Sequence, residues 1–163
     1  MVNFFVNFFS SFSPRVATFL MAMTPFGELR LSLPVSLLLY HLPLEQAFVI
    51  SVLGNMIPPT IILIFAAQFH KWIHKKSGFF AKKWVNYLAQ VQNKFSGKYQ
   101  KYGLVALVIF VGVPFPMTGA YSGAVAAFIF GLPAKYSWPC IFIGVVISGV
   151  ITTLVSLGLG RLF

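Results

Sequence analysis

The hydrophobic positions of this chain form long runs that are interrupted by proline and glycine rather than by charged residues. The clearest interruption lies in VGVPFPMTGAYSGAVAAFIFGLP, residues 111–133. Proline lacks a backbone N–H and clashes with the preceding helical turn, so the pattern predicts two short helices, over residues 104–113 and 118–130. Each is shorter than the roughly 20 residues that a membrane crossing needs. In lipid, a broken backbone must be buried in protein or line a wet cavity, so we expect a re-entrant helical hairpin.

A second stretch, TPFGELRLSLPVSLLLYHLP at residues 24–43, repeats this pattern and predicts hairpin arms over residues 16–23 and 29–40. The matched pairs are Pro25-Phe26 with Pro114-Phe115, Leu42-Pro43 with Leu132-Pro133, and Leu53-Gly54 with Ile143-Gly144. Broken helices at corresponding places in two repeats indicate a transporter-type site between the halves.

Residues 44–69 and 137–159 are apolar and long enough for full membrane crossings. Pro58 and Pro59 predict a kink in the first crossing, and the second is rich in small residues that let helices approach closely. One crossing in each half is an odd number, so the two halves must be inverted relative to one another. The positive-inside rule then places the lysine-rich segment between them in the cytoplasm and both termini outside.

Residues 70–102 contain eight lysines, and their apolar side chains recur every three or four positions. This spacing predicts an amphipathic helix that lies against anionic lipid headgroups. Nucleic-acid binding is the competing interpretation, and the neighbouring apolar runs disfavour it. Residues 1–13 are rich in Phe, Asn and Ser, and we expect them to lie in the membrane interface. The alternative is that residues 4–23 span the membrane.

The composition agrees with an all-α integral membrane protein, because 58% of the 163 residues are hydrophobic and only 9% are charged. The mean hydropathy is +0.86 and the formal net charge is +10. We expect a single membrane domain over residues 1–163, in which a basic connector at 70–102 joins repeats at 14–69 and 103–160. The single cysteine, Cys140, excludes an intramolecular disulfide and has no partners for a metal site.

Only two residues are acidic, Glu28 and Glu45. Glu45 follows Pro43 and is expected at the outer membrane face, in contact with water. Glu28 lies in the first hairpin turn, near membrane mid-depth and two residues before Arg30. Ionisable groups at that depth are costly and indicate a functional site. The alternative is that Glu28 and Arg30 pair and hold the turn in place.

Both predicted return arms begin at mid-depth, where free backbone N–H groups and the helix dipole favour anions. The candidate residues for binding or coupling are Glu28, Arg30, Ser32, Asn55, Pro114, Pro116, Thr118, Gly119, Tyr121 and Ser122. Asn55 could instead make a helix–helix hydrogen bond. Glu28 could carry a proton or, with no anion bound, meet a lipophilic cation. No nucleophile–base–acid set supports an enzyme, and no cofactor or metal is expected.

The motifs PFGELRLSLPVSLLL, LGN and VPFPMTGAYSGA resemble the small multidrug export family of prokaryotic membrane proteins. That family resembles, more distantly, the DedA-like (VTT-domain) superfamily. The resemblance implies two re-entrant hairpins that face each other, with acidic and arginine residues at the site, here Glu28 and Arg30. It also implies the transfer of lipid phosphates such as undecaprenyl phosphate, in a multi-pass protein of the inner membrane.

The sequence therefore favours a carrier or flippase for an amphiphilic anion such as a polyprenyl or lipid phosphate, with proton coupling through Glu28. One alternative is a proton-coupled exporter of lipophilic cations, and another is a membrane scaffold with no transport cycle. The expected partners are membrane lipids and a small amphiphilic substrate. A homodimer is left open, and nucleic acid is not expected.

Overall fold

The computed structural model describes residues 12–25, 27–74, 98–115 and 118–159, together with residues 86 and 90, and every regular element in them is helical. The elements are α2 (Pro14–Ala22), α3 (Glu28–Pro34), the π-helical turn η1 (Val35–Leu39), α4 (Leu44–His74), α6 (Lys98–Gly112), α7 (Ala120–Ile129) and α8 (Ala134–Leu159). The prediction of an all-helical chain is therefore confirmed for the described residues.

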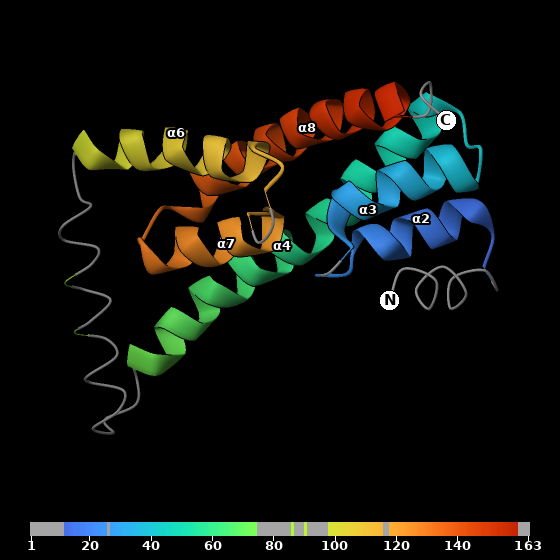
Figure 1. The fold of residues 1–163 in the computed structure, drawn as a ribbon. Coiled ribbons are helices and arrows are strands. Elements are labelled where there is room, and N and C mark those ends of the chain that lie inside the picture. The colour runs from blue at the N-terminus through green and yellow to red at the C-terminus, as the bar shows by residue number, and fades with distance from the viewer. Residues whose placement is uncertain are drawn as a thin grey trace.

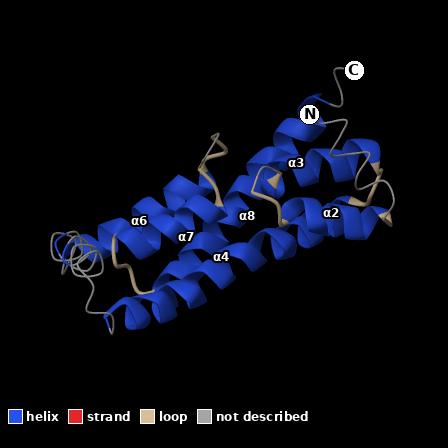
Figure 2. Ribbon diagram, turned by 90° about the horizontal axis from the view of Figure 1, so that it is seen from below, coloured by secondary structure: helices blue, strands red, loops and turns tan. Residues whose placement is uncertain are grey.

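Two long helices, α4 and α8, run along the molecule, and two short helical hairpins flank them (Figure 1). The α2–α3 hairpin enters from one end, and the α6–α7 hairpin enters from the opposite end. Figure 2, a view from below, shows the same arrangement, with the turns of both hairpins near the middle. The turns of the two hairpins therefore meet near the centre of the molecule.

The helices pack in a matched pattern. The first arm of each hairpin lies on the long helix that follows it in the chain, α2 on α4 and α6 on α8. The return arm of each hairpin lies on the long helix of the other half, α3 on α8 and α7 on α4. The two halves are therefore interlocked, and each hairpin turn lies beside residues of the other half.

Glycines at corresponding positions allow the first arms to approach the long helices closely. A Cβ added to Gly54 of α4 would lie 2.6 Å from the Phe19 carbonyl oxygen in α2. A Cβ added to Gly144 of α8 would lie 2.7 Å from the Val111 Cβ in α6. Real Cβ atoms do not approach other atoms so closely, so a larger residue at either position would push the helices apart.

The return arms also end alike. His41 follows η1 with φ 48°, and Gly131 follows α7 with φ 67°, so both lie in the left-handed region. A residue in this conformation stops a helix and turns the chain. Each is followed by Leu-Pro, and the long helices begin directly after Pro43 and Pro133.

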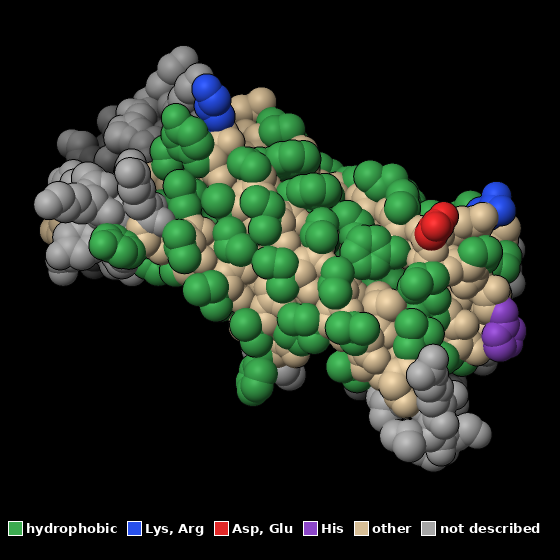
Figure 3. All heavy atoms as spheres, turned by 90° about the horizontal axis from the view of Figure 1, so that it is seen from above, with side chains coloured by type: hydrophobic (Ala, Val, Ile, Leu, Met, Phe, Trp, Pro, Cys, Tyr) green, Lys and Arg blue, Asp and Glu red, His purple; other side chains and the backbone are tan. Residues whose placement is uncertain are grey.

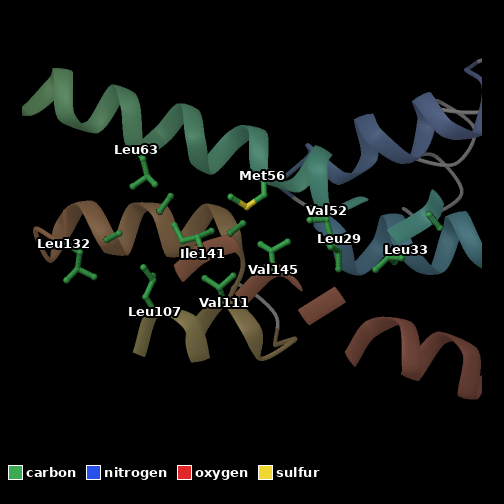
Figure 4. Close-up of a cluster of buried hydrophobic side chains, with 14 residues drawn as sticks. Leu29, Leu33, Val52, Met56, Leu63, Leu107, Val111, Leu132, Ile141 and Val145 are labelled. Atoms are coloured by element: carbon green, nitrogen blue, oxygen red, sulfur yellow. The ribbon is translucent and has the colours of Figure 1, made fainter. Parts of the chain in front are cut away.

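The main buried core joins α3, α4, α6, α7 and α8, and a second, smaller cluster joins α2 to η1. The largest members of the main core come from α3, α4, α6 and α8 and lie between the long helices and the hairpins (Figure 4): Leu29, Leu33, Val52, Met56, Leu63, Leu107, Val111, Ile141 and Val145. Many other large apolar side chains are exposed. On the face in Figure 3, hydrophobic side chains cover the middle, and the charged side chains of the described residues lie towards the two ends. Such a surface suits a hydrocarbon environment.

Two stretches are long and apolar enough to cross a membrane, Leu44–Phe65 in α4 and Ala134–Gly158 in α8. They agree with the two predicted crossings. The helix α4 continues through Pro58 and Pro59 without a break, and the Thr60 hydroxyl donates to the Met56 carbonyl at 2.6 Å. Figure 1 shows α4 as one unbroken ribbon.

Some element limits differ from the predictions. The first arm of the second hairpin begins at Lys98, six residues before the predicted start at residue 104, because polar residues can extend an apolar helix. The return arm of the first hairpin contains Pro34 and becomes π-helical after it. The predicted interfacial segment at 1–13 and most of the amphipathic connector at 70–102 lie outside the described residues.

Candidate functional site

The turn of the first hairpin places Glu28 at the start of α3. The Thr24 hydroxyl donates to the Met21 carbonyl at 2.8 Å and accepts from the Gly27 N–H at 3.0 Å. The Glu28 N–H donates to the Thr24 carbonyl at 3.0 Å. Glu28 itself has φ 42°, a left-handed conformation that is uncommon for a residue with a side chain. Backbone strain of this kind is often found at functional sites.

The turn of the second hairpin is organised by Thr118. Its hydroxyl lies 2.9 Å from the Val113 carbonyl and 2.8 Å from the Phe115 carbonyl. Directly after it, the Ser122 hydroxyl accepts from the Gly119 N–H at 2.8 Å and so caps the start of α7. The side chains of Thr118 and Ser122 therefore bind backbone groups between the end of α6 and the start of α7, where helical hydrogen bonds are absent.

The Glu28 carboxylate crosses to the second hairpin and lies at the N-terminus of α7. A Cβ added to Gly119 would overlap both carboxylate oxygens. The carboxylate interacts with the backbone N–H of Tyr121, a group that has no partner within its own helix. Gly119 is in an ordinary extended conformation, so it is the space beside its Cα, and not backbone strain, that calls for glycine here. The glycine and the helix dipole together form a place for an oxyanion.

The Arg30 guanidinium also crosses to the second hairpin, where it binds backbone oxygen atoms. Nη1 donates to the Phe115 carbonyl, and Nη2 donates to the Thr118 carbonyl. Nη2 also lies 3.1 Å from the Val113 carbonyl and 3.2 Å from the Thr118 hydroxyl. One side chain thus provides donors to three carbonyls of a turn that two prolines interrupt. Arg30 interacts with Glu28 electrostatically, but its hydrogen bonds hold the other hairpin.

The second hairpin makes the reverse contact. The Tyr121 hydroxyl, in the first turn of α7, donates to the Met23 carbonyl at the end of α2. Each return arm therefore supplies a side chain that binds the backbone at the turn of the opposite hairpin. The two turns are held together by these side chains and by the carboxylate of Glu28.

Most of the predicted site residues meet here. Glu28, Arg30, Thr118, Gly119, Tyr121 and Ser122 lie together, with Pro114 in the same turn, whereas Pro116 lies outside the described residues. Their roles in binding stay predictions. The carbonyls of Met23, Val113 and Phe115 were not predicted as part of this site.

Ser32 and Asn55 differ from the rest of the predicted set. Ser32 is fully buried, and its hydroxyl lies 3.5 Å from the Leu29 carbonyl of its own helix. Asn55 is 3% exposed, and its side-chain oxygen has no hydrogen-bond partner in the described part of the chain. Neither the helix–helix hydrogen bond nor the binding role predicted for Asn55 is decided by this geometry.

A family model with the description "Putative small multi-drug export protein" matches residues 28–151. The match begins at Glu28, directly after the first hairpin turn, and includes Arg30, the second hairpin turn and Tyr121. The chain belongs to this family. Its members are described as exporters and not as enzymes, and together with the two apolar helices this makes the chain a membrane protein.

No curated protein and no protein of known structure matches the chain. The family match confirms the resemblance to the small multidrug export family. The more distant resemblance to DedA-like proteins stays a prediction.

Proposed function

We propose that this member of the small multidrug export family is a proton-coupled carrier that binds an amphiphilic cation at Glu28. The single observation that supports this function is the position of the Glu28 carboxylate, between the two hairpin turns and beside Gly119. Glu45, the other acidic residue, is exposed in the first turn of α4. The N–H groups of Arg30 donate to carbonyls of the second turn. The Glu28 carboxylate can therefore release a proton and bind a cation in its place.

The proposed architecture is an inverted repeat in which both hairpins are re-entrant. The nine residues of α2 are too few to cross a bilayer, since a helix rises about 1.5 Å per residue. The opposite entry of the hairpins, the corresponding contacts of Gly54 and Gly144, and the matched ends at His41 and Gly131 all support it. Glu28 would then lie near mid-membrane, and the basic connector would lie in the cytoplasm.

Access to the site is supported by the exposure of the second turn. Phe115 is 66% exposed, and Glu28 and Arg30 are only partly buried. An amphiphile in the hydrocarbon layer could therefore approach the hairpin turns from the side, with its charged group at Glu28 and its apolar part along the exposed hydrophobic residues. This lateral route suits a substrate that partitions into lipid.

A second candidate is the carrier or flippase for an amphiphilic anion such as a polyprenyl or lipid phosphate. The N-terminus of α7, with the hydroxyls of Thr118 and Ser122, favours it. However, the Glu28 carboxylate already lies at this N-terminus, and the donors of Arg30 are already bound to carbonyls. An anion would have to displace both groups, which is why we place the cation first.

The test is transport in proteoliposomes with an imposed proton gradient, using tetraphenylphosphonium as the cation and a fluorescent polyprenyl phosphate as the anion. We expect proton-driven movement of the cation, its loss in Glu28→Gln, and normal transport in the control Glu45→Gln. Movement of the anion alone would support the second candidate. If neither probe moves and Glu28→Gln is fully active in cells, the chain is a scaffold without a transport cycle.

A further inference from the structure

We propose that Arg30 and Tyr121 form a reciprocal latch between the two hairpin turns, and that this latch must open once in each transport cycle. The inference rests on the proposed function, since it describes how the site at Glu28 becomes accessible. The opening of the latch is a motion of the two hairpin turns, and it can be measured without any substrate.

The latch is defined by contacts between residues that are far apart in the sequence. Arg30, on α3, donates to the carbonyls of Phe115 and Thr118 in the second turn. Tyr121, on α7, donates to the Met23 carbonyl at the end of the first hairpin's first arm. Both side chains lie within the first three residues of their return arms, so the two contacts close the same gap from opposite sides.

The acceptors explain why these contacts can break. The Val113 and Phe115 carbonyls also accept from backbone N–H groups of their own turn, those of Phe115 at 2.8 Å and Thr118 at 3.1 Å, so each keeps a donor when Arg30 moves away. If the turns separate and water enters, water can donate to the same carbonyls. The free energy lost when each latch hydrogen bond breaks is then small. The latch is therefore stable when the gap is dry and weak when the gap is wet, which is the behaviour of a gate.

The position of Glu28 connects the latch to the site. Its carboxylate lies beside Gly119, between the residues that make the two contacts. With the latch closed, the Glu28 side chain is partly exposed and its carboxylate lies against Gly119 of the second hairpin. Separation of the turns would expose Glu28 to a proton or a substrate and would relieve its left-handed backbone conformation.

The experiment measures how often the gap opens, from the labelling rate of a cysteine buried beside it. The background is Cys140→Ala, which removes the only native cysteine. Ala120→Cys places a thiol at a position that is 1% exposed at the start of α7, next to Tyr121. Ala127→Cys, at a position that is 0% exposed two turns further along the same helix, is the matched control. The probe is a membrane-permeant maleimide.

We expect Tyr121→Phe to raise the labelling rate at position 120 about fivefold, the effect of losing one hydrogen bond, and Arg30→Lys to raise it by roughly tenfold or more. Neither variant should change labelling at position 127. The controls Tyr136→Phe and Arg15→Lys, both at exposed positions, should change neither rate. The two latch variants should also increase the proton leak of proteoliposomes in the absence of substrate.

An unchanged labelling rate at position 120 in both latch variants would overturn the proposal. An equal increase at positions 120 and 127 would also overturn it, because it would show general loosening of the fold. If the rates change as expected while no substrate moves in any assay, the latch stands and the proposed function falls. If transport depends on Glu28 while the labelling rates stay constant, the proposed function stands and the latch falls.

Discussion

The Glu28 carboxylate occupies the space in which a side chain at Gly119 would begin. These residues belong to opposite hairpins and are separated by most of the chain. Even one methyl group added at position 119 would therefore displace the Glu28 carboxylate. Among the described residues, this is the only acidic group between the hairpin turns.

The first prediction concerns this contact. Gly119→Ala should displace the carboxylate from the N-terminus of α7 and reduce transport by roughly a hundredfold, as a shift of about 1 Å in a functional group can do. The backbone of Gly119 is extended, so the variant should fold. The control is Gly158→Ala in α8, where an added Cβ meets nothing within 4 Å. Normal transport by Gly119→Ala at equal expression would contradict the assigned position of Glu28.

The second prediction compares Arg30 with the lysines of the connector. Arg30→Lys keeps the charge but loses the planar group that reaches several carbonyls, so transport should fall by roughly tenfold or more. The connector is predicted to lie against lipid headgroups, where each lysine would contribute about 1 kcal/mol of lipid attraction and one lysine could replace another. The combined Lys82, Lys83 and Lys94 to Gln variant should therefore transport normally. The opposite ranking, measured at equal expression, would place the functional site at the membrane interface.

The third prediction concerns the matched glycines of the long helices. Gly54→Val and Gly144→Val should each destabilise the protein by about 1–3 kcal/mol, because each adds atoms to a close helix contact. Thermal unfolding in detergent, with Gly158→Val as the control, measures the effect. A large effect in one half and none in the other would count against a repeat in which both halves pack alike.

The fourth prediction concerns topology. In the Cys140→Ala background, Asn3→Cys and Leu44→Cys should react with an impermeant maleimide from outside the cell, and Ala134→Cys only after the cytoplasmic side is made accessible. Helix α4 begins at Leu44 and α8 at Ala134, at opposite ends of the molecule. Labelling of Asn3→Cys only from the cytoplasm would mean that the N-terminal segment spans the membrane and would remove the basis for the inversion.

The two hairpins could be predicted from the sequence because the ends of their helices are set by local residues, chiefly proline. Pro114 ends one arm, and the Leu-Pro pairs at Pro43 and Pro133 mark the starts of the long helices. The early start of α6 at Lys98 was not predicted, because the apolar run begins only at residue 104, although Lys and Gln are good helix formers. The π-helical turn after Pro34 has no signal in the local sequence.

The partner of Arg30 was missed for a related reason. Glu28 is two residues away in the sequence and carries the opposite charge, so a local interpretation pairs the two. The acceptors that Arg30 binds are 83 to 88 residues away. A signal was present, since Pro114 leaves the carbonyls of its turn without helical donors, and arginine has five donors to supply. The N-terminus of α7 was predicted as an anion site, but its nearest oxyanion is Glu28 of the same chain.

The exchange of a proton for an amphiphilic cation at Glu28 can be measured as proton release when the cation binds. The purified protein, in weakly buffered detergent solution with a pH-sensitive dye, is titrated with tetraphenylphosphonium at several starting pH values. We expect release of up to about one proton for each cation bound, in the parent and in Glu45→Gln, and none in Glu28→Gln. Binding of the cation without proton release at any pH, or release that persists in Glu28→Gln, would contradict this exchange.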